Sequence, residues 1–181
     1  MELSKLSTPL KANEIEFRVQ SINKGGYATI LAYKDARVDM QRLDDVCTPL
    51  GWKREHCRDN KNCIVSIWDE NKKQWVSKED TGTESNAEAE KGLASDSFKR
   101  ACFNWGIGRE LYDYPLIQIK LNGDGKNNKD EWFIHTDKGR DYPKAGWGLK
   151  LKSWVWFNQF DDENNLIYLG AKDEKGVLRF N

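Results

Sequence analysis

Net charge is the first thing that this sequence of 181 residues lacks, because 29 basic residues are balanced by 29 acidic ones. A role in binding nucleic acid must therefore rest on a local patch rather than on bulk charge. Long apolar runs are also absent, and no stretch approaches the roughly 18 residues of a membrane span. Residues 1–17 lack the apolar middle of a signal peptide and differ from an organelle presequence in their acidic side chains. The expected location is the cytoplasm.

Recognisable catalytic motifs are also missing. No GxxxxGK[ST] phosphate loop occurs, and the Gly-Ile-Gly at 106–108 is followed by Arg-Glu rather than by the start of a helix. The two histidines have no paired Ser or Cys at a recognisable catalytic elbow. The four cysteines form no CxxC, and the spacing of His56, Cys57 and Cys63 does not fit a structural zinc site. We expect free, partly buried thiols, no cofactor, no metal and no enzymatic activity.

Two short acidic-basic patterns leave a metal-dependent nuclease as an alternative. They are Asp-Asn-Lys at 59–61 and Glu-Asn-Lys at 70–72. A nuclease gathers carboxylates around a metal ion, often with a lysine nearby. Both patterns fall in expected turns, where solvated charges are normal, so the nuclease is the least favoured reading.

The patterning that is present predicts an α+β fold. Asp35 is expected to cap a helix at its N-terminus. Alternating apolar residues and short polar turns predict strands, and helical periodicity predicts two helices. In chain order the expected elements are strands 14–22 and 27–33, helix 36–47, strands 52–57, 62–68 and 73–79, and helix 87–105. This order, β-β-α-β-β-β-α, predicts an antiparallel meander of about five strands packed on the long second helix.

The tail beyond residue 115 differs in composition and is expected to be rich in β-structure. Residues 139–146 are expected to form a loop, and residues 147–160 one long strand. Further strands are expected at 116–122, 131–137, 165–173 and 177–180. We therefore divide the chain into a core, 1–115, and a Trp-containing extension, 116–181, packed on the core or at a subunit interface.

The second helix combines an apolar stripe with a basic face. The stripe is expected to contain Ala87, Glu90, Ala94, Phe98, Ala101 and Trp105, with Gly106 as a left-handed C-cap. Lys99 and Arg100 lie off this stripe, and Phe103 lies nearly opposite it. Together with Lys91 and Arg109, the two cations make the segment net basic despite Asp96. Cations beside an aromatic ring suit single-stranded nucleic acid, and the alternative is an ordinary solvated helix face.

A family resemblance favours the first alternative. Residues 87–115, AEAEKGLASDSFKRACFNWGIGRELYDYP, resemble the signature helix of the Rad-fifty-two family of single-strand annealing proteins and of their phage-encoded, Sak-type relatives. Upstream, Arg37, Val38, Gly51 and Trp52 resemble an earlier helix of the family, and Arg18 resembles an arginine of its DNA groove. In the signature helix and turn the matching positions are Ala94, Ser95, Asp96, Phe98, Lys99, Arg100, Ala101, Trp105, Gly106, Leu111, Tyr112 and Asp113.

The resemblance covers about residues 14–115 and implies a function. It implies a homo-oligomeric ring or spiral that binds single-stranded DNA in a basic groove and anneals complementary strands without ATP, in recombination and double-strand break repair. Lys99 and Arg100 match the basic pair of that groove, and Arg18 a further phosphate contact. The remaining candidates for DNA binding are Lys91, Arg109, Phe103 and Arg37. A phage-encoded chain of this kind would act in the host cytoplasm, and a single-strand-binding protein is a candidate partner.

Two questions stay open at this level. The helix face with Phe103 can instead dock a protein partner, which would make the chain a structural or interaction module. The tail also contains a basic stretch, which is either a second DNA site or a set of solvated charges. Its members are Lys138, Arg140, Lys144, Lys150 and Lys152.

Overall fold

The computed structural model describes residues 2–83 and 89–181 of an α+β protein whose sheets are mostly antiparallel. The chain forms two compact units that alternate along the sequence. The first unit contains Met1–Leu10 and Lys34–Glu110, and the second contains Lys11–Tyr33 and Leu111–Asn181. The expected α+β class is therefore confirmed.

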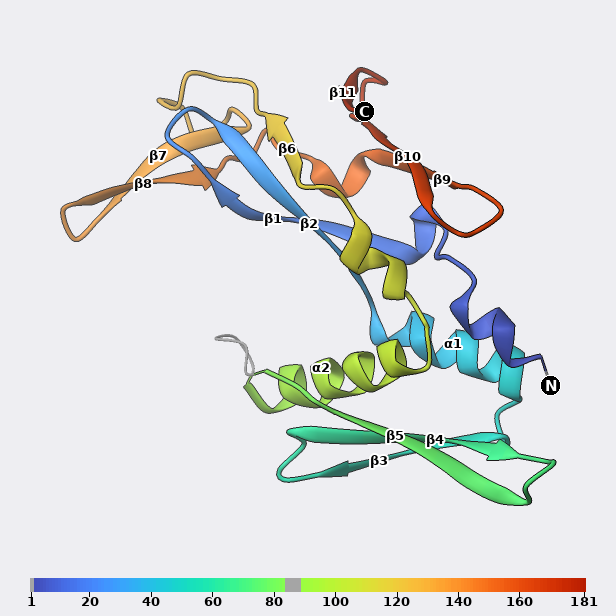
Figure 1. Ribbon diagram of the computed structural model, residues 1–181. Coiled ribbons are helices and arrows are strands. Elements are labelled where there is room, and N and C mark those ends of the chain that lie inside the picture. The colour runs from blue at the N-terminus through green and yellow to red at the C-terminus, as the bar shows by residue number, and fades with distance from the viewer. Residues whose placement is uncertain (1, 84–88) are drawn as a thin grey trace. The chain divides into compact units, whose positions relative to one another are not determined.

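The first unit packs two helices with one three-stranded sheet. Its strands β3 (Trp52–Cys57), β4 (Asn62–Asp69) and β5 (Gln74–Thr81) pair in the order β3-β4-β5, antiparallel throughout. Helix α2 (Ala89–Asn104) lies along β4 and β5, as Figure 1 shows, and also contacts helix α1 (Ala36–Cys47). A short 3₁₀ helix, Leu3–Ser7, packs on α1. The β-β-α-β-β-β-α order of the sequence analysis is confirmed.

Local signals explain where the helices begin and end. The Asp35 side chain accepts a hydrogen bond from the backbone N–H of Arg37 (2.8 Å), which caps α1 as predicted. Leu43 and Cys47, four residues apart, are both buried on one face of α1. Gly106 has a φ of 98° and follows the last turn of α2, as the predicted left-handed C-cap requires.

The buried face of α2 differs from the predicted stripe. Leu93, Ser97 and Cys102 are buried beside Phe98 and Ala101. The polar Ser97 is tolerated in this buried position because its hydroxyl donates a hydrogen bond to the backbone oxygen of Asn60 (3.0 Å). Trp105 stays half-buried, with its Nε1 donating to the oxygen of Val65 (3.0 Å). Ala87 and Glu90, also placed in that stripe, fall outside the described side chains.

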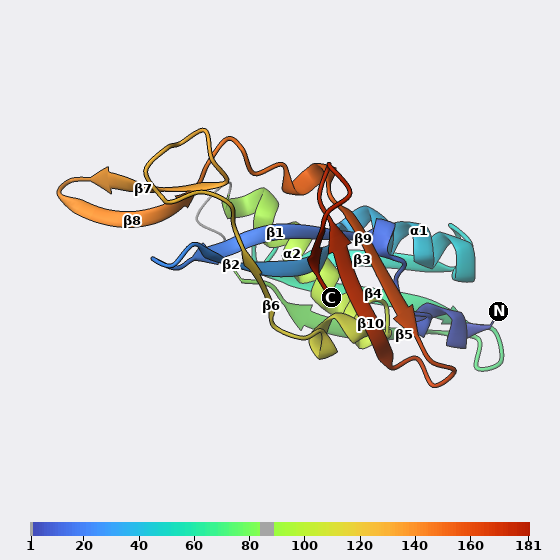
Figure 2. The ribbon, with the colours of Figure 1, turned by 90° about the horizontal axis from the view of Figure 1, so that it is seen from above.

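The second unit is built from eight strands in three sheets. The sheet orders are β1-β2-β6, β7-β8 and β11-β10-β9. Figure 2 shows β1 beside β2 and β9 beside β10. The strands are β1 (Ile15–Ile22), β2 (Tyr27–Lys34), β6 (Ile117–Lys120), β7 (Trp132–Asp137), β8 (Arg140–Ala145), β9 (Val155–Phe160), β10 (Leu166–Lys172) and β11 (Leu178–Phe180). The 3₁₀ helices Ala12–Glu14, Arg109–Asp113 and Leu151–Ser153 complete the fold.

The expected single meander of five strands is wrong. Strand β2 pairs with β6 from the tail, so Ala28 lies opposite Ile119 and Ile30 opposite Ile117. All four side chains are buried in a core that also contains Trp132 and Trp154. The apolar face of the β1–β2 hairpin is thus covered by the tail, which alternation within the hairpin alone does not reveal.

Two expectations for the tail are also wrong. Residues 140–145, expected as a loop, form β8, and Pro143 is tolerated because β8 is an edge strand paired only with β7. The expected strand 147–160 is reduced to β9. Residues 147–154 form no strand. The chain there packs tightly on the backbone of Asp130, since a Cβ added at Gly146 or Gly148 would lie 2.1 or 2.8 Å from that backbone.

The two compact units do not divide the chain at residue 115. The hairpin β1–β2, which the sequence analysis places in the core 1–115, belongs by its contacts to the same unit as the tail. The functional division between a DNA-binding core and an extension is a separate matter and stays a prediction.

Candidate nucleic-acid interface

Lys99 and Arg100 lie next to each other on α2, and their surroundings differ. Both side chains are half-buried. Arg100 places its Nε 3.4 Å from Asp80 Oδ1 at the end of β5, so part of its charge is already compensated. No carboxylate of the described residues forms an ion pair with Lys99. Lys99 is therefore the better placed of the two to bind an external anion.

Phe103 is not a freely projecting ring. Its side chain is half-buried, and Nζ of Lys34 lies 3.9 Å from the ring centroid. Lys34 is itself buried and donates to the backbone oxygen of Ile107 (2.6 Å) and to Asp39. One face of the ring therefore has a partner inside the unit. Less of the Phe103 side chain is therefore accessible to a protein partner than the sequence suggests, which weakens the alternative of an interaction module.

The Lys34–Asp39 pair is fully buried and was not foreseen. Burial raises the pKa of Asp39 to about 6, although the nearby Lys34 ammonium opposes this shift. Burial likewise lowers the pKa of Lys34, against the attraction of Asp39. A lysine at the end of the alternating strand YATILAYK, at an inward position, was the sequence signal for it.

Arg109 and Asp96 have local structural contacts. The Arg109 guanidinium donates to the backbone oxygens of Phe103 (2.9 Å) and Asn104 (3.2 Å), which satisfies the C-terminal end of α2. Asp96 accepts from the backbone N–H of Thr83 (2.9 Å) and from its hydroxyl. Asp96 thus holds Thr83, in the segment that precedes α2, against the helix.

The remaining candidates lie elsewhere in the chain. Arg37 is exposed at the first turn of α1, with its Nε 3.6 Å from Asp35. Arg18 is exposed on β1 in the second unit, and its guanidinium lies 5.3 Å from the Tyr33 ring centroid. The Lys91 side chain falls outside the described side chains. Among the candidates whose side chains the structure describes, Lys99, Arg100, Phe103 and Arg109 lie on one segment, α2 and the residues just beyond it.

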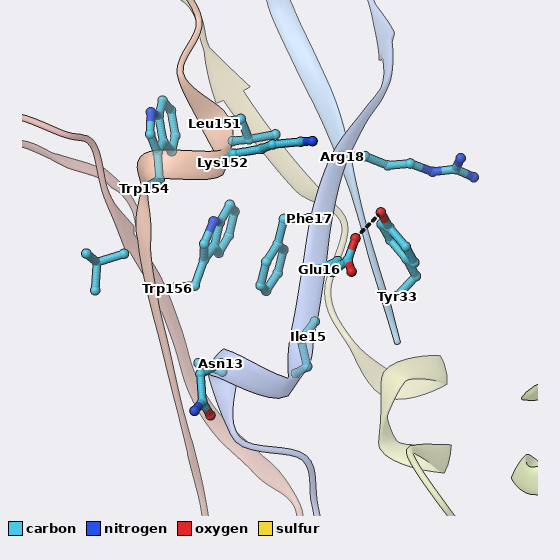
Figure 3. A pocket seen from close by; sticks show the side chains of 12 residues that line it. Asn13, Ile15, Glu16, Phe17, Arg18, Tyr33, Leu151, Lys152, Trp154 and Trp156 are labelled. Atoms are coloured by element: carbon cyan, nitrogen blue, oxygen red, sulfur yellow. Dashed lines mark hydrogen bonds between the residues drawn. The ribbon is translucent and has the colours of Figure 1, made fainter. Parts of the chain in front are cut away.

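The second unit contains a cavity that the sequence analysis missed. Its volume is about 590 Å³, and aromatic rings and two cations line it, as Figure 3 shows. The pattern Trp154-Val155-Trp156 was an available signal, since residues two apart on an extended segment share a face. The sequence analysis used this alternation only to predict a strand.

Other expectations can be checked against the described residues. All four cysteines are free, with Cys47, Cys63 and Cys102 buried and Cys57 exposed, as predicted. Within residues 2–83 and 89–181 no cluster of His, Cys, Asp and Glu is arranged to hold a metal ion. The patterns at 59–61 and 70–72 lie in and beside the turns around β4. No helix in the described part of the chain is long and apolar enough to cross a membrane.

Comparison with known proteins identifies the class. Residues 66–130, which contain β4, β5, α2 and the glycine turn, match the Rad52/22 family of double-strand break repair proteins. The match over this segment confirms the resemblance seen in the sequence.

Two curated relatives are each named single-stranded DNA-binding protein DdrA. The protein from Deinococcus radiodurans is 33% identical over 114 residues, which are 61% of this chain and 54% of the relative. The protein from Deinococcus deserti is 34% identical over 121 residues, which are 65% of this chain and 60% of the relative. The match thus spans little more than half the length of these relatives. No solved structure matches significantly.

Proposed function

We propose that this chain binds single-stranded DNA and anneals complementary strands in recombination and double-strand break repair. The observation that supports this most is the Rad52/22 match over the segment whose helix α2 carries Lys99. Lys99 forms no ion pair among the described residues, although its charge also acts on the buried Asp39. The names of the two relatives point to the same ligand. The activity is non-enzymatic: base pairing and stacking drive annealing, so neither ATP nor a cofactor is required.

The balance of charge in this chain argues for a repeated site. A single subunit with a few cations holds DNA weakly, because each phosphate contact contributes only a little through counterion release. In a ring or spiral of identical subunits the same contacts add along one strand. We propose such a homo-oligomer, with the strand in a groove that contains α2, and a location in the cytoplasm.

The proposed phosphate contacts rank by their surroundings. Lys99 comes first, and Arg100 second because Asp80 competes for it. Arg18 and Arg37 are exposed and follow. Lys91 and Arg109 are supporting contacts, and Phe103 comes last because Lys34 already lies over one face of its ring.

Salt-dependent binding of a labelled oligonucleotide tests the assignment. Lys99→Ala should weaken binding and reduce the slope of log K against log salt by about 0.7, the value for one contact to a single strand. Lys72→Ala is the matched control, since Lys72 is exposed in the β4–β5 turn and pairs with Asp69. An unchanged slope for Lys99→Ala together with Arg100→Ala contradicts the proposed groove.

Annealing and assembly need their own measurements. Two complementary labelled oligonucleotides should pair faster with the protein than without it, in the absence of any nucleotide. Analytical ultracentrifugation should show a species of many subunits. A stable monomer that binds DNA but does not accelerate pairing would reduce the function to DNA binding.

A further inference from the structure

The aromatic cavity of the second unit is the strongest unassigned feature of the molecule. It lies between the start of β1 and the segment that leads from the 3₁₀ helix Leu151–Ser153 into β9 (Figure 3). All of its lining residues belong to the second unit. With about 590 Å³ it falls in the size range of small-molecule sites.

Stacked rings form one wall of this cavity. Phe17 and Trp156 are parallel within 3°, with ring centroids 3.7 Å apart. Trp154 lies on the far side, with its centroid 6.5 Å from that of Trp156 and its plane tilted by 26°. This spacing follows from the extended backbone, where residues two apart share a face about 6.6 Å from each other. Phe17 and Trp156 therefore stack on each other and leave no room for a ring between them, and Arg179 lies over the Trp154 ring, with its Cζ 4.7 Å from the centroid. A planar ligand would have to stack on an outer face of this series.

Two hydrogen-bond donors in this wall have no protein acceptor. The Nε1 atoms of Trp154 and Trp156 are both buried, and no described residue accepts from either. Trp154 as a whole is only 6% exposed. Buried indole N–H groups normally find a partner, because an unpaired one is unfavourable.

The charge at the cavity is positive on balance. Arg18 and Lys152 are exposed side chains of its lining. In Figure 3 Lys152 lies beside the aromatic rings, whereas Arg18 points away from them on the other side of β1, where Tyr33 lies. Glu16 is the one carboxylate among the lining residues, and it accepts a hydrogen bond from the Tyr33 hydroxyl (2.5 Å). A ligand that fits is therefore planar at one end and anionic at the other.

We propose that this cavity binds one nucleotide of a single-stranded DNA. The base stacks on the aromatic wall of Phe17, Trp154 and Trp156, and the flanking phosphates bind Arg18 and Lys152. Stacking tolerates any base, as a sequence-independent site requires. The proposal rests on the proposed function, and it adds a base-stacking subsite in the second unit to the phosphate contacts of α2.

Photo-crosslinking of the full chain tests the proposal directly. A single-stranded oligothymidylate with 5-iodo-deoxyuridine is bound and irradiated, and the tryptic peptides are analysed by mass spectrometry. We expect cross-links in residues 12–18, which contain Phe17, or in residues 153–172, which contain Trp154 and Trp156. Cross-links confined to residues 92–99 and 101–109 of the α2 region would overturn the subsite and leave the proposed function standing.

Charge variants give a second, independent measurement. Arg18→Ala with Lys152→Ala should reduce the salt slope by about 1.4, which corresponds to two contacts with a single strand. Arg18→Ala with Lys150→Ala is the matched control, because Lys150 is exposed two residues away but does not line the cavity, and it should lose only half as much. All three positions, Arg18, Lys150 and Lys152, are exposed, so the variants should fold, which circular dichroism checks.

Three other results overturn the proposal in distinguishable ways. Equal slopes for the two double variants show that Lys152 binds no phosphate. Unchanged DNA binding with a changed subunit number shows that the cavity holds a second copy of the chain. Absence of all binding to single strands removes the proposed function itself, and the subsite with it.

Discussion

The two compact units bury charge in contrasting ways. In the second unit the Arg179 side chain, 8% exposed, donates to both carboxylate oxygens of Glu131 (2.9 and 2.7 Å), to Asp173 (3.2 Å) and to the backbone oxygen of Lys120 (3.1 Å). In the first unit Lys34, 1% exposed, meets one oxygen of Asp39, while Asp39 Oδ2 has no hydrogen-bond partner among the described residues.

The difference shows that the geometry of the cation determines how many buried carboxylate oxygens it can satisfy. A guanidinium is a planar fork that can satisfy two carboxylates at once, whereas an ammonium acts as a point charge. Burial alone would raise the pKa of Glu131, but hydrogen bonds from Arg179 and from the backbone of Asn122 hold it below its usual value. Asp39 lacks such support, and burial raises its pKa to about 6.

Removal of Arg179 should have the largest effect on stability. Arg179→Met leaves Glu131 and Asp173 buried as like charges, and we expect a loss of about 3–5 kcal/mol in the free energy of unfolding. Urea unfolding measures this. Arg179→Lys is the control, because it keeps the positive charge but loses the planar guanidinium. Its free energy of unfolding should lie between those of the wild type and Arg179→Met. A loss of less than about 1 kcal/mol would show that the network contributes specificity rather than stability.

Substitution in the Lys34–Asp39 pair of the first unit should reduce stability somewhat less, and an apolar pair should partly restore it. Asp39→Asn leaves the Lys34 ammonium buried without a counter-charge but with one acceptor, so we expect a loss of about 3 kcal/mol. Lys34→Met combined with Asp39→Leu should recover most of that loss, because an apolar pair avoids the desolvation of two ions. If the double variant is as unstable as the single one, the pair stabilises the unit through its charges.

The pH dependence of stability should also differ between the buried carboxylates of the two units. The pKa of Asp39 is higher in the folded chain, at about 6, than its ordinary value of 3.8, so the folded state binds more protons between these limits. This group therefore makes the protein less stable as the pH rises from about 4 to 6, by on the order of 2 kcal/mol. Carboxylates with lowered pKa, such as Glu131, act in the opposite sense.

The measurement compares urea unfolding of the wild type and of Asp39→Asn at several pH values. The difference in the free energy of unfolding should shrink as the pH rises towards 6, because a growing fraction of the buried Asp39 carboxyl is then ionised, reaching one half at its pKa of about 6. A difference that stays constant across this range would place the pKa of Asp39 at its ordinary value.

Thiol labelling should change stability least and report on one unit alone. All four cysteines lie between residues 47 and 102, in the first unit. Burial raises the pKa of Cys63 to about 11 and also that of Cys102, so little thiolate is present there. A maleimide should label only Cys57 in the native protein, as counted by intact mass. The other three should react in urea as the first unit opens, and labelling of Cys63 or Cys102 in native buffer would contradict their burial.

Local features were predictable where the sequence itself supplies the determinant. Helix α1 has its predicted bounds because Asp35 caps it and Leu43 and Cys47 define its buried face. Strands β3 to β5 follow alternation and short polar turns. The partner of β2 was not predictable, because alternation identifies a buried face but not the strand that covers it. Strand β8 was missed because Gly139 and Pro143 are typical of loops.

The candidate site divides in the same way. The positions of Lys99 and Arg100 on α2 follow from the family pattern and from helical spacing. The ion pair between Arg100 and Asp80 joins residues 20 positions apart, on a helix and a strand, so only the fold reveals it. The cavity was missed because its walls come from β1 and from residues 151–156, segments that have no common pattern.

The pairing of β2 with β6 has a consequence for synthesis of the chain. More than 80 residues separate Lys34, where β2 ends, from Ile117, where β6 begins. At about 5–20 residues per second the ribosome needs several seconds to deliver β6. An isolated hairpin is marginally stable, and its open edge can pair with other chains. The unit that begins at residue 11 is thus completed last, and it is the part of the nascent protein that most needs protection by chaperones.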